Sequence, residues 1–163
     1  MEKLFTHMES PIGPLSIVRN DKGICAIRFS ILEEEEAIVF QPSDSLLVEA
    51  VHQLEEYFQQ NRTSFELPVD IKGTDFQQSV WEALRHIPIG ETRSYSEIAE
   101  QIGNKKAVRA VGQANRANPV PIIIPCHRVI GKNQSLTGYA GKEIDKKREL
   151  LKIEGVLSRI NGQ

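Results

Sequence analysis

The sequence predicts an α+β protein: a small N-terminal antiparallel sheet with one helix, followed by a mostly helical C-terminal lobe that contains a helix-turn-helix. Three observations carry this prediction. The first third of the chain alternates short β-branched and aromatic segments with turn residues, two helix-capping boxes follow between residues 74 and 97, and the net charge changes from negative to positive near residue 71. A chain of 163 residues is long enough for one moderate domain or two small lobes.

Charge marks the expected boundary between the lobes. Residues 1–70 contain 5 Lys and Arg against 13 Asp and Glu, a net charge of −8, whereas residues 71–163 contain 15 against 9, a net charge of +6. We therefore expect lobes at residues 1–72 and 73–163. A basic second lobe suggests that this half alone meets nucleic acid, although solvated surface side chains would explain the charge by themselves.

The N-terminal lobe is predicted to begin with an antiparallel meander. Residues 4–8, 15–19 and 24–29 are expected to be strands, because Pro-Ile-Gly-Pro and Asn-Asp-Lys-Gly turn sequences separate them. A helix should follow from Ser43 or Ser45, where apolar residues begin to recur at steps of three and four. Its apolar face would contain Leu46, Leu47, Ala50, Val51, Leu54, Tyr57 and Phe58. Residues 64–69 are expected to add an edge strand.

Two capping boxes predict helices in the C-terminal lobe. They are Thr74-Asp75-Phe76-Gln77 and Ser94-Tyr95-Ser96-Glu97, in which a hydroxyl and a side-chain amide or carboxylate satisfy the first backbone amides of a helix. The second of these helices should end at Gly103, and another is expected from Lys106 to about Ala117. A short helix, a Gly-containing turn and a further helix outline a helix-turn-helix.

The second helix of this motif has two distinct faces. Val108, Val111 and Asn115 share one side and should face the protein. The opposite side is formed by Arg109, Gly112, Gln113 and Arg116. That side has a small residue where it would approach a DNA backbone closely and arginines where it would reach phosphate. An exposed helix with two solvated arginines would have the same pattern.

The chemistry of the chain is expected at Cys126 and His127. Ile122, Ile123 and Ile124 predict a buried strand that Pro125 ends, so the thiol would stand at the end of a rigid element. Such a position suits a nucleophile, yet a single cysteine is more often a small buried hydrophobic residue. Cys25, the other cysteine, is expected to be such a structural thiol, and the two fit no metal spacing.

Five motifs occur in order along the second half of the chain. They are Arg109-Ala110-Val111-Gly112, Asn118-Pro119, Pro125-Cys126-His127-Arg128-Val129-Ile130, Gly138-Tyr139-Ala140-Gly141 and Glu154-Gly155. The series resembles the O6-alkylguanine-DNA alkyltransferase (methylated-DNA–protein-cysteine methyltransferase) family. The resemblance implies a ribonuclease H-like N-terminal lobe and direct-reversal DNA repair, in which Cys126 accepts the alkyl group of O6-alkylguanine, and of O4-alkylthymine as a further substrate, irreversibly and without a cofactor.

The resemblance also implies the roles of the residues around the thiol. His127 would remove the thiol proton through a water, Glu154 would orient the imidazole, and Tyr95 would supply a proton to the leaving guanine. Asn118 would shape the turn beside Cys126. Tyr139, Ala140 and Gly141 would line the pocket for the flipped base.

The expected partner is double-stranded DNA that contains alkylated guanine, bound through its minor groove. Arg109 matches the family's arginine finger, which fills the gap left by the flipped nucleotide. The other DNA-binding residues implied are Ala110, Gly112, Gln113, Arg116 and Arg128. The protein is expected to be a cytoplasmic monomer, because it has neither a signal peptide nor an apolar segment of membrane-spanning length, and no metal is expected.

The chain departs from the family pattern after Gly141. Lys142 stands where the family usually has another glycine, residues 142–148 are longer than usual, and the Trp common before the Leu-Leu pair is absent at Glu149. The main alternative is a non-catalytic alkyltransferase-like protein that flips damaged guanine to recruit excision repair, but such proteins lack the cysteine. A helix-turn-helix repressor would need no Cys-His-Glu set, and a thiol hydrolase would turn over.

Overall fold

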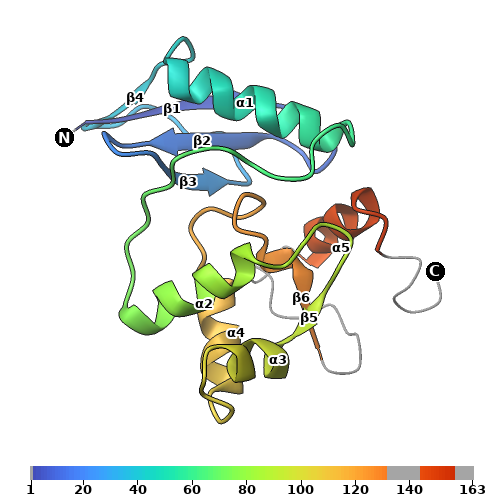
Figure 1. Ribbon diagram of the computed structural model, residues 1–163. Coiled ribbons are helices and arrows are strands. Elements are labelled where there is room, and N and C mark those ends of the chain that lie inside the picture. Colours follow the sequence, from blue (N-terminus) through green and yellow to red (C-terminus); the bar gives the residue numbers. More distant parts are fainter. Residues whose placement is uncertain (1, 132–143, 157–163) are drawn as a thin grey trace. The chain divides into compact units, whose positions relative to one another are not determined.

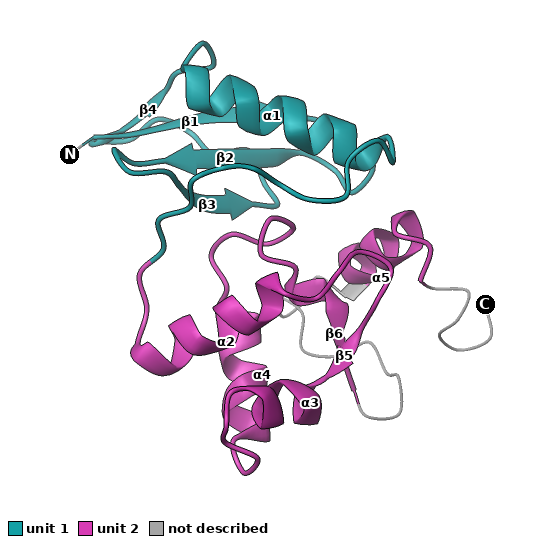
Figure 2. Ribbon diagram, in the orientation of Figure 1, with its two compact units in different colours: residues 1–71 teal, residues 72–163 magenta. Residues whose placement is uncertain are grey.

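The computed structural model describes residues 2–131 and 144–156, and the chain divides into two compact units, residues 1–71 and 72–163 (Figure 2). Unit 1 holds a sheet and a helix, and unit 2 is mostly helical (Figure 1). The predicted α+β class is therefore confirmed. No helix in the described residues is long and apolar enough to span a membrane.

The sheet of unit 1 has the strand order β3-β2-β1-β4. The strands are β1 (Lys3–Met8), β2 (Leu15–Arg19), β3 (Ile24–Arg28) and β4 (Ile38–Phe40). The predicted meander is confirmed, because β2 pairs antiparallel with both β1 and β3. The expectation of an entirely antiparallel sheet was wrong, because β4 pairs parallel with β1.

The edge strand expected at residues 64–69 was also wrong. This segment makes an isolated bridge between Val69 and Ile24, in which the Ile24 amide donates to the Pro68 carbonyl at 2.8 Å. Pro68 has no amide hydrogen to donate, so a regular ladder cannot extend through it.

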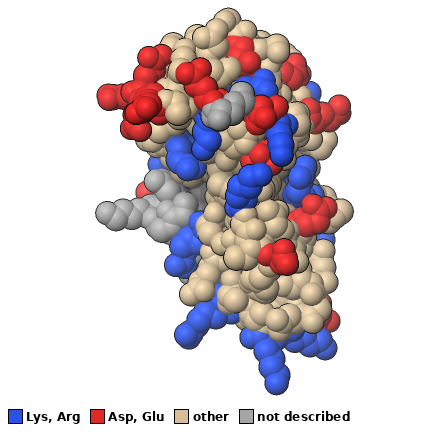
Figure 3. Space-filling model, turned by 90° about the vertical axis from the view of Figure 1, so that its left-hand side faces the viewer, with Lys and Arg blue, Asp and Glu red and all other residues tan. Residues whose placement is uncertain are grey.

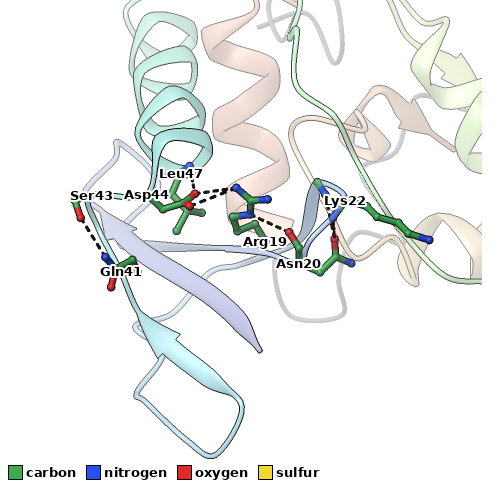
Figure 4. A network of polar contacts seen from close by, with 8 residues as sticks. Arg19, Asn20, Lys22, Gln41, Ser43, Asp44 and Leu47 are labelled. Carbon is green, nitrogen blue, oxygen red and sulfur yellow. Dashed lines mark hydrogen bonds and ion pairs between the residues drawn. The ribbon is translucent and has the colours of Figure 1, made fainter. Parts of the chain in front are cut away.

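Helix α1 (Ser45–Phe58) packs on the sheet and buries Leu47, Ala50, Leu54 and Tyr57. It begins because the Asp44 carboxylate accepts a hydrogen bond from the Leu47 amide. The same carboxylate forms an ion pair with Arg19 at the end of β2, with Nη1 and Oδ2 3.2 Å apart (Figure 4). The helix start is therefore tied directly to the sheet.

Unit 2 contains the helices that surround the candidate site. They are α2 (Asp75–Arg85), α3 (Tyr95–Gln101), α4 (Val108–Arg116) and α5 (Ile144–Ile153), together with the 3-10 helix η1 (Cys126–Arg128). Short strands β5 (Arg93–Ser94) and β6 (Val129–Ile130) pair in parallel. Both predicted capping boxes are present, at the starts of α2 and α3.

The predicted helix-turn-helix corresponds to α3 and α4. Between them Gly103 has a φ of 80°, the left-handed conformation that suits glycine after a helix end. Helix α4 is held against α2 by a hydrogen bond of 2.9 Å, which the Trp81 indole donates to the Ala114 carbonyl. Of the residues predicted to face inward, Val111 and Asn115 are buried and Val108 is half-buried, so the predicted inward face of α4 is confirmed; Ala114 is buried as well.

The strand predicted at Ile122–Ile124 was wrong. Ile122 has a φ of 77°, and the Ile124 amide donates back to the Val120 carbonyl at 3.0 Å, so the chain folds on itself. The Asn118 side chain closes this loop by donating to the Ile124 carbonyl at 2.8 Å and accepting from the Val120 amide at 2.9 Å. These buried hydrogen bonds override the strand preference of the isoleucines.

We expect Thr74→Ala to lower the free energy of unfolding of unit 2 by about 1 kcal/mol, because the start of α2 loses its cap. Urea unfolding followed by the fluorescence of Trp81, the single Trp of the chain, measures this change. Ser79→Ala is the matched control within α2. Its hydroxyl bonds the Asp75 carbonyl inside the helix, and removing such a bond should be neutral or stabilising. Equal losses in both variants would contradict the capping argument.

Candidate active site and nucleic-acid interface

Cys126 begins η1 and is buried, with 3% of its surface exposed. Burial raises the pKa of its thiol to about 11, although the Asn118 side chain, the charge of Lys147 and backbone amides act in the opposite direction. The thiol is therefore protonated at neutral pH. Since the thiolate is the nucleophilic form of cysteine, the site needs a group that takes up the proton.

His127, which directly follows Cys126, forms an acid-base pair with Glu154. The imidazole Nε2 lies 2.6 Å from Glu154 Oε2, and both side chains are completely buried. Arg128 binds the same carboxylate through two atoms, with Nε 2.8 Å from Oε1 and Nη2 3.1 Å from Oε2. Its Nη1 donates to the Ile87 carbonyl at 2.7 Å, which joins η1 to the segment after α2.

The hydrogen bonds define how the proton is held on His127. Burial alone would raise the pKa of Glu154, but the hydrogen bonds donated by His127 and Arg128, together with the permanent charge of Arg128, outweigh it and hold the pKa well below its usual range. A carboxylate only accepts, so Nε2 carries the imidazole hydrogen and Nδ1 carries the lone pair.

The Nδ1 atom of His127 is therefore the basic atom of the site. It is buried and has no hydrogen-bond partner among residues 2–131 and 144–156. Burial lowers the pKa of His127, an effect that Glu154 partly offsets, and the imidazole is neutral and able to accept a proton. The structure thus brings together Cys126, a neutral histidine and a fixed carboxylate.

Arg128 is not placed with the residues expected to bind DNA. Its side chain is 8% exposed, and its guanidinium is occupied by Glu154 and the Ile87 carbonyl. The prediction that it contacts DNA is therefore corrected: its place in the Pro-Cys-His-Arg motif puts it inside the protein, where it holds Glu154 ionised.

Tyr95 and Asn118 come from two different segments around the site, helix α3 and the loop before η1. Tyr95 is the first residue of α3 and is half-buried, with its ring close to Gly112 of α4, where an added Cβ would be 3.9 Å from the ring atoms. Asn118 lies in the loop before Cys126, and its side chain acts to lower the pKa of the thiol against the larger effect of burial. Tyr139, Ala140, Gly141 and Lys142 lie outside the described residues.

Two buried polar residues near the thiol were not predicted as site residues. Asn115 of α4 donates to the Cys126 carbonyl at 3.2 Å. Lys147 of α5 is fully buried, donates to the Val129 carbonyl at 2.6 Å and lies 5.9 Å from the centroid of the Tyr95 ring. The sequence contained a signal that Lys147 faces the site. Lys147 precedes Leu150 and Leu151 by three and four residues and Glu154 by seven, so on a helix all four residues lie on the same face.

The opposite face of α4 is open and basic. Arg109, Gln113 and Arg116 are exposed, and Ala110 and Gly112 are half-buried between them. Lys105 and Lys106, just before the helix, are exposed as well. Figure 3 shows Asp and Glu gathered mainly over unit 1, and a predominance of Lys and Arg over the lower part of the view, which is formed by unit 2. No group of His, Cys, Asp and Glu that could hold a metal ion occurs in the part of the chain that the structure describes.

Two family models match the chain along nearly its whole length. Residues 3–71 match the 6-O-methylguanine DNA methyltransferase ribonuclease-like domain, and residues 75–156 match the 6-O-methylguanine DNA methyltransferase DNA binding domain. The chain belongs to the 6-O-methylguanine DNA methyltransferase family. The family predicted from the ordered motifs is thereby confirmed.

Relatives of this methyltransferase family cover most of the chain. The constitutive methylated-DNA–protein-cysteine methyltransferase of Bacillus subtilis is 46% identical over 160 residues, which is 93% of this chain and 95% of that protein. The Methanosarcina barkeri methylated-DNA–protein-cysteine methyltransferase is 50% identical over 152 residues, 90% of this chain and 94% of that protein. Mycobacterium tuberculosis OGT in complex with DNA has a TM-score of 0.85 at 45% identity, covering 93% of both chains.

We expect Arg128→Met to lower the free energy of unfolding of unit 2 by roughly 3 kcal/mol or more, because Glu154 would remain buried without its permanent cation. Arg116→Met, which removes an exposed arginine from α4, should change it by less than about 0.5 kcal/mol. Urea unfolding with Trp81 fluorescence compares the two variants. Similar small losses would mean that Arg128 does not stabilise the buried carboxylate.

Proposed function

We propose that this methyltransferase repairs alkylated DNA by moving the alkyl group from the O6 position of guanine to Cys126, once per protein molecule. The observation that carries the proposal is the buried His127–Glu154–Arg128 network beside a protonated thiol. DNA binding and methyl transfer to a protein cysteine are the functions named for the family and its relatives.

The proposed reaction begins with loss of the thiol proton toward Nδ1 of His127. The sulfur electron pair then forms the bond to the alkyl carbon, while the bond between that carbon and O6 breaks and its electrons pass to guanine. We propose that the Tyr95 hydroxyl donates a proton to guanine. Tyr95 is then reprotonated by the proton that His127 took from the thiol and releases. The products are a thioether and an unmodified guanine, so the atoms and protons balance without a cofactor.

Asn118 is proposed to direct the thiol rather than to exchange a proton. Its amide holds the loop through Val120 and Ile124 and acts to lower the pKa of the Cys126 thiol, so it favours the anion at a fixed position. Tyr139, Ala140 and Gly141 are proposed to line the pocket for the extruded base.

The exposed face of α4 is the proposed DNA-binding surface. The small residues Ala110 and Gly112 would let the helix approach the minor groove, and Arg116 and Gln113 would contact the backbone. Arg109 would enter the stack where the alkylated nucleotide leaves it. One chain supplies both this surface and the thiol, and we therefore propose a cytoplasmic monomer in which residues 73–163 act on DNA and residues 1–72 form the N-terminal lobe.

The stoichiometry of repair tests the proposal directly. Incubation with DNA containing O6-methylguanine should add a single methyl group to each protein molecule, because a thioether does not hydrolyse. Intact-mass measurement should find this gain in the unmodified protein and none in Cys126→Ala, and peptide mass mapping should locate it at Cys126. Cys25→Ala should react like the unmodified protein. Continued turnover, or a methyl group on Cys25, would exclude this function.

The role of Arg109 is tested by two substrates. Extruding a base from duplex DNA costs a few kcal/mol, so Arg109→Ala should slow repair of alkylated duplex by about tenfold or more. Reaction with free O6-benzylguanine, which needs no extrusion, should change little. Arg116→Ala is the matched control: it should weaken DNA binding modestly and reduce its salt dependence by about one charge. Equal losses of Arg109→Ala on duplex and free base would assign Arg109 to the fold instead.

A further inference from the structure

Lys147 is buried in the site, although the mechanism above gives it no role. None of its side chain is exposed, and Nζ donates to the Val129 carbonyl at 2.6 Å. Lysine is almost never buried completely unless its charge is compensated. Burial disfavours the ammonium form, and the Val129 carbonyl and the negative form of Cys126 partly compensate it.

The packing of α5 brings this cation to the thiol. Helix α5 contacts η1, and the Val129 carbonyl that holds Nζ belongs to the strand that continues directly from η1. Lys147 and Cys126 interact electrostatically, and the interaction favours the charged form of each. The Tyr95 ring, 5.9 Å from Nζ, adds an aromatic face that attracts a cation.

The other charges of the site are arranged differently. Among the described residues, titratable groups that interact with Lys147 include Cys126 and His127 from η1 and Tyr95 from α3. Arg128 is bound by Glu154, whose carboxylate balances it. The positive charge of Lys147, in contrast, acts on the sulfur that must become negative.

We propose that the buried ammonium group of Lys147 stabilises the thiolate form of Cys126 while His127 takes up the thiol proton. Lys147 is thus a positioning residue, and it neither gains nor loses a proton in the step. The S–H electron pair stays on sulfur and becomes the S–C bond as the C–O6 bond breaks. The proposal rests on the proposed function for the identity of the electrophile, but the effect on the thiolate holds for any alkylating reagent.

This arrangement gives the reaction a particular pH dependence. Burial lowers the pKa of Lys147 to about 8, below that of the thiol. Below pH 8 the ammonium is charged, and raising the pH lets the thiol lose its proton to solvent as well as to His127, which increases the thiolate fraction. Above pH 8 Lys147 loses its proton and its support of the thiolate is lost, so the alkylation rate should level off near pH 8. Without Lys147 the rate should keep rising toward the pKa of the thiol.

The experiment measures alkylation of Cys126 as a function of pH in a Cys25→Ala background, with iodoacetamide and with O6-benzylguanine. Lys147→Gln keeps a hydrogen-bond donor and removes the charge. It should be about threefold or more slower at neutral pH, and the gap should close in alkaline solution because a less stable thiolate is the better nucleophile. Lys147→Arg keeps the charge and should retain the neutral rate without levelling near pH 8. Lys152→Gln, at an exposed position of α5, should behave like the parent.

Two results would overturn the proposal. One is a Lys147→Gln profile that matches the parent, including the levelling near pH 8. The other is a uniform loss of rate at every pH in both the Gln and Arg variants, which would assign Lys147 to packing. Iodoacetamide requires neither DNA nor guanine, so failure of DNA repair with an intact Lys147 effect would reject the proposed function alone.

Discussion

The rest of the site depends on one buried carboxylate, that of Glu154. Arg128 is a permanent cation and keeps it ionised, and the carboxylate then fixes the hydrogen of His127 on Nε2. The same contacts join the C-terminal end of α5 to η1, and Arg128 adds the Ile87 carbonyl beyond α2. The protonation state of the imidazole and the position of the cysteine segment therefore have a common origin.

The loop before Cys126 places the sulfur at a cost in backbone strain. A β-branched residue with positive φ, as at Ile122, is disfavoured by about 1–3 kcal/mol. The Asn118 amide offsets this with hydrogen bonds to both ends of the turn, and the isoleucine side chains are buried. The thiol is thus fixed by a strained but buried loop and not by the end of a strand.

Local signals in the sequence predicted the elements whose ends are determined locally. The Thr74 and Ser94 capping boxes and the faces of α4 needed no information beyond a few neighbouring residues. The parallel pairing of β4 and the burial of Arg128 depend on partners distant in sequence, Lys3–Phe5 for β4 and Glu154 for Arg128. The folded isoleucine run depends on the nearby Asn118 side chain, whose hydrogen bonds the apolar pattern does not reveal. Lys147 was partly predictable. Its helical spacing indicated the face on which it lies, but only the packing of α5 on η1 showed which residues it approaches.

The pKa shifts of Cys126, His127 and Lys147 disfavour their charged forms before the site reacts, which suits a cysteine that is used once. Burial raises the pKa of Cys126 and lowers those of His127 and Lys147, so each of the three is pushed toward its neutral form. A protonated, buried thiol is slow to oxidise or to react with adventitious electrophiles. In the proposed mechanism the proton moves to His127, so the new imidazolium would have Glu154 beside it and the thiolate would have Lys147, and each charge would form next to its counterion. The low polarity that protects the resting sulfur thereby strengthens the interactions that stabilise its reactive form.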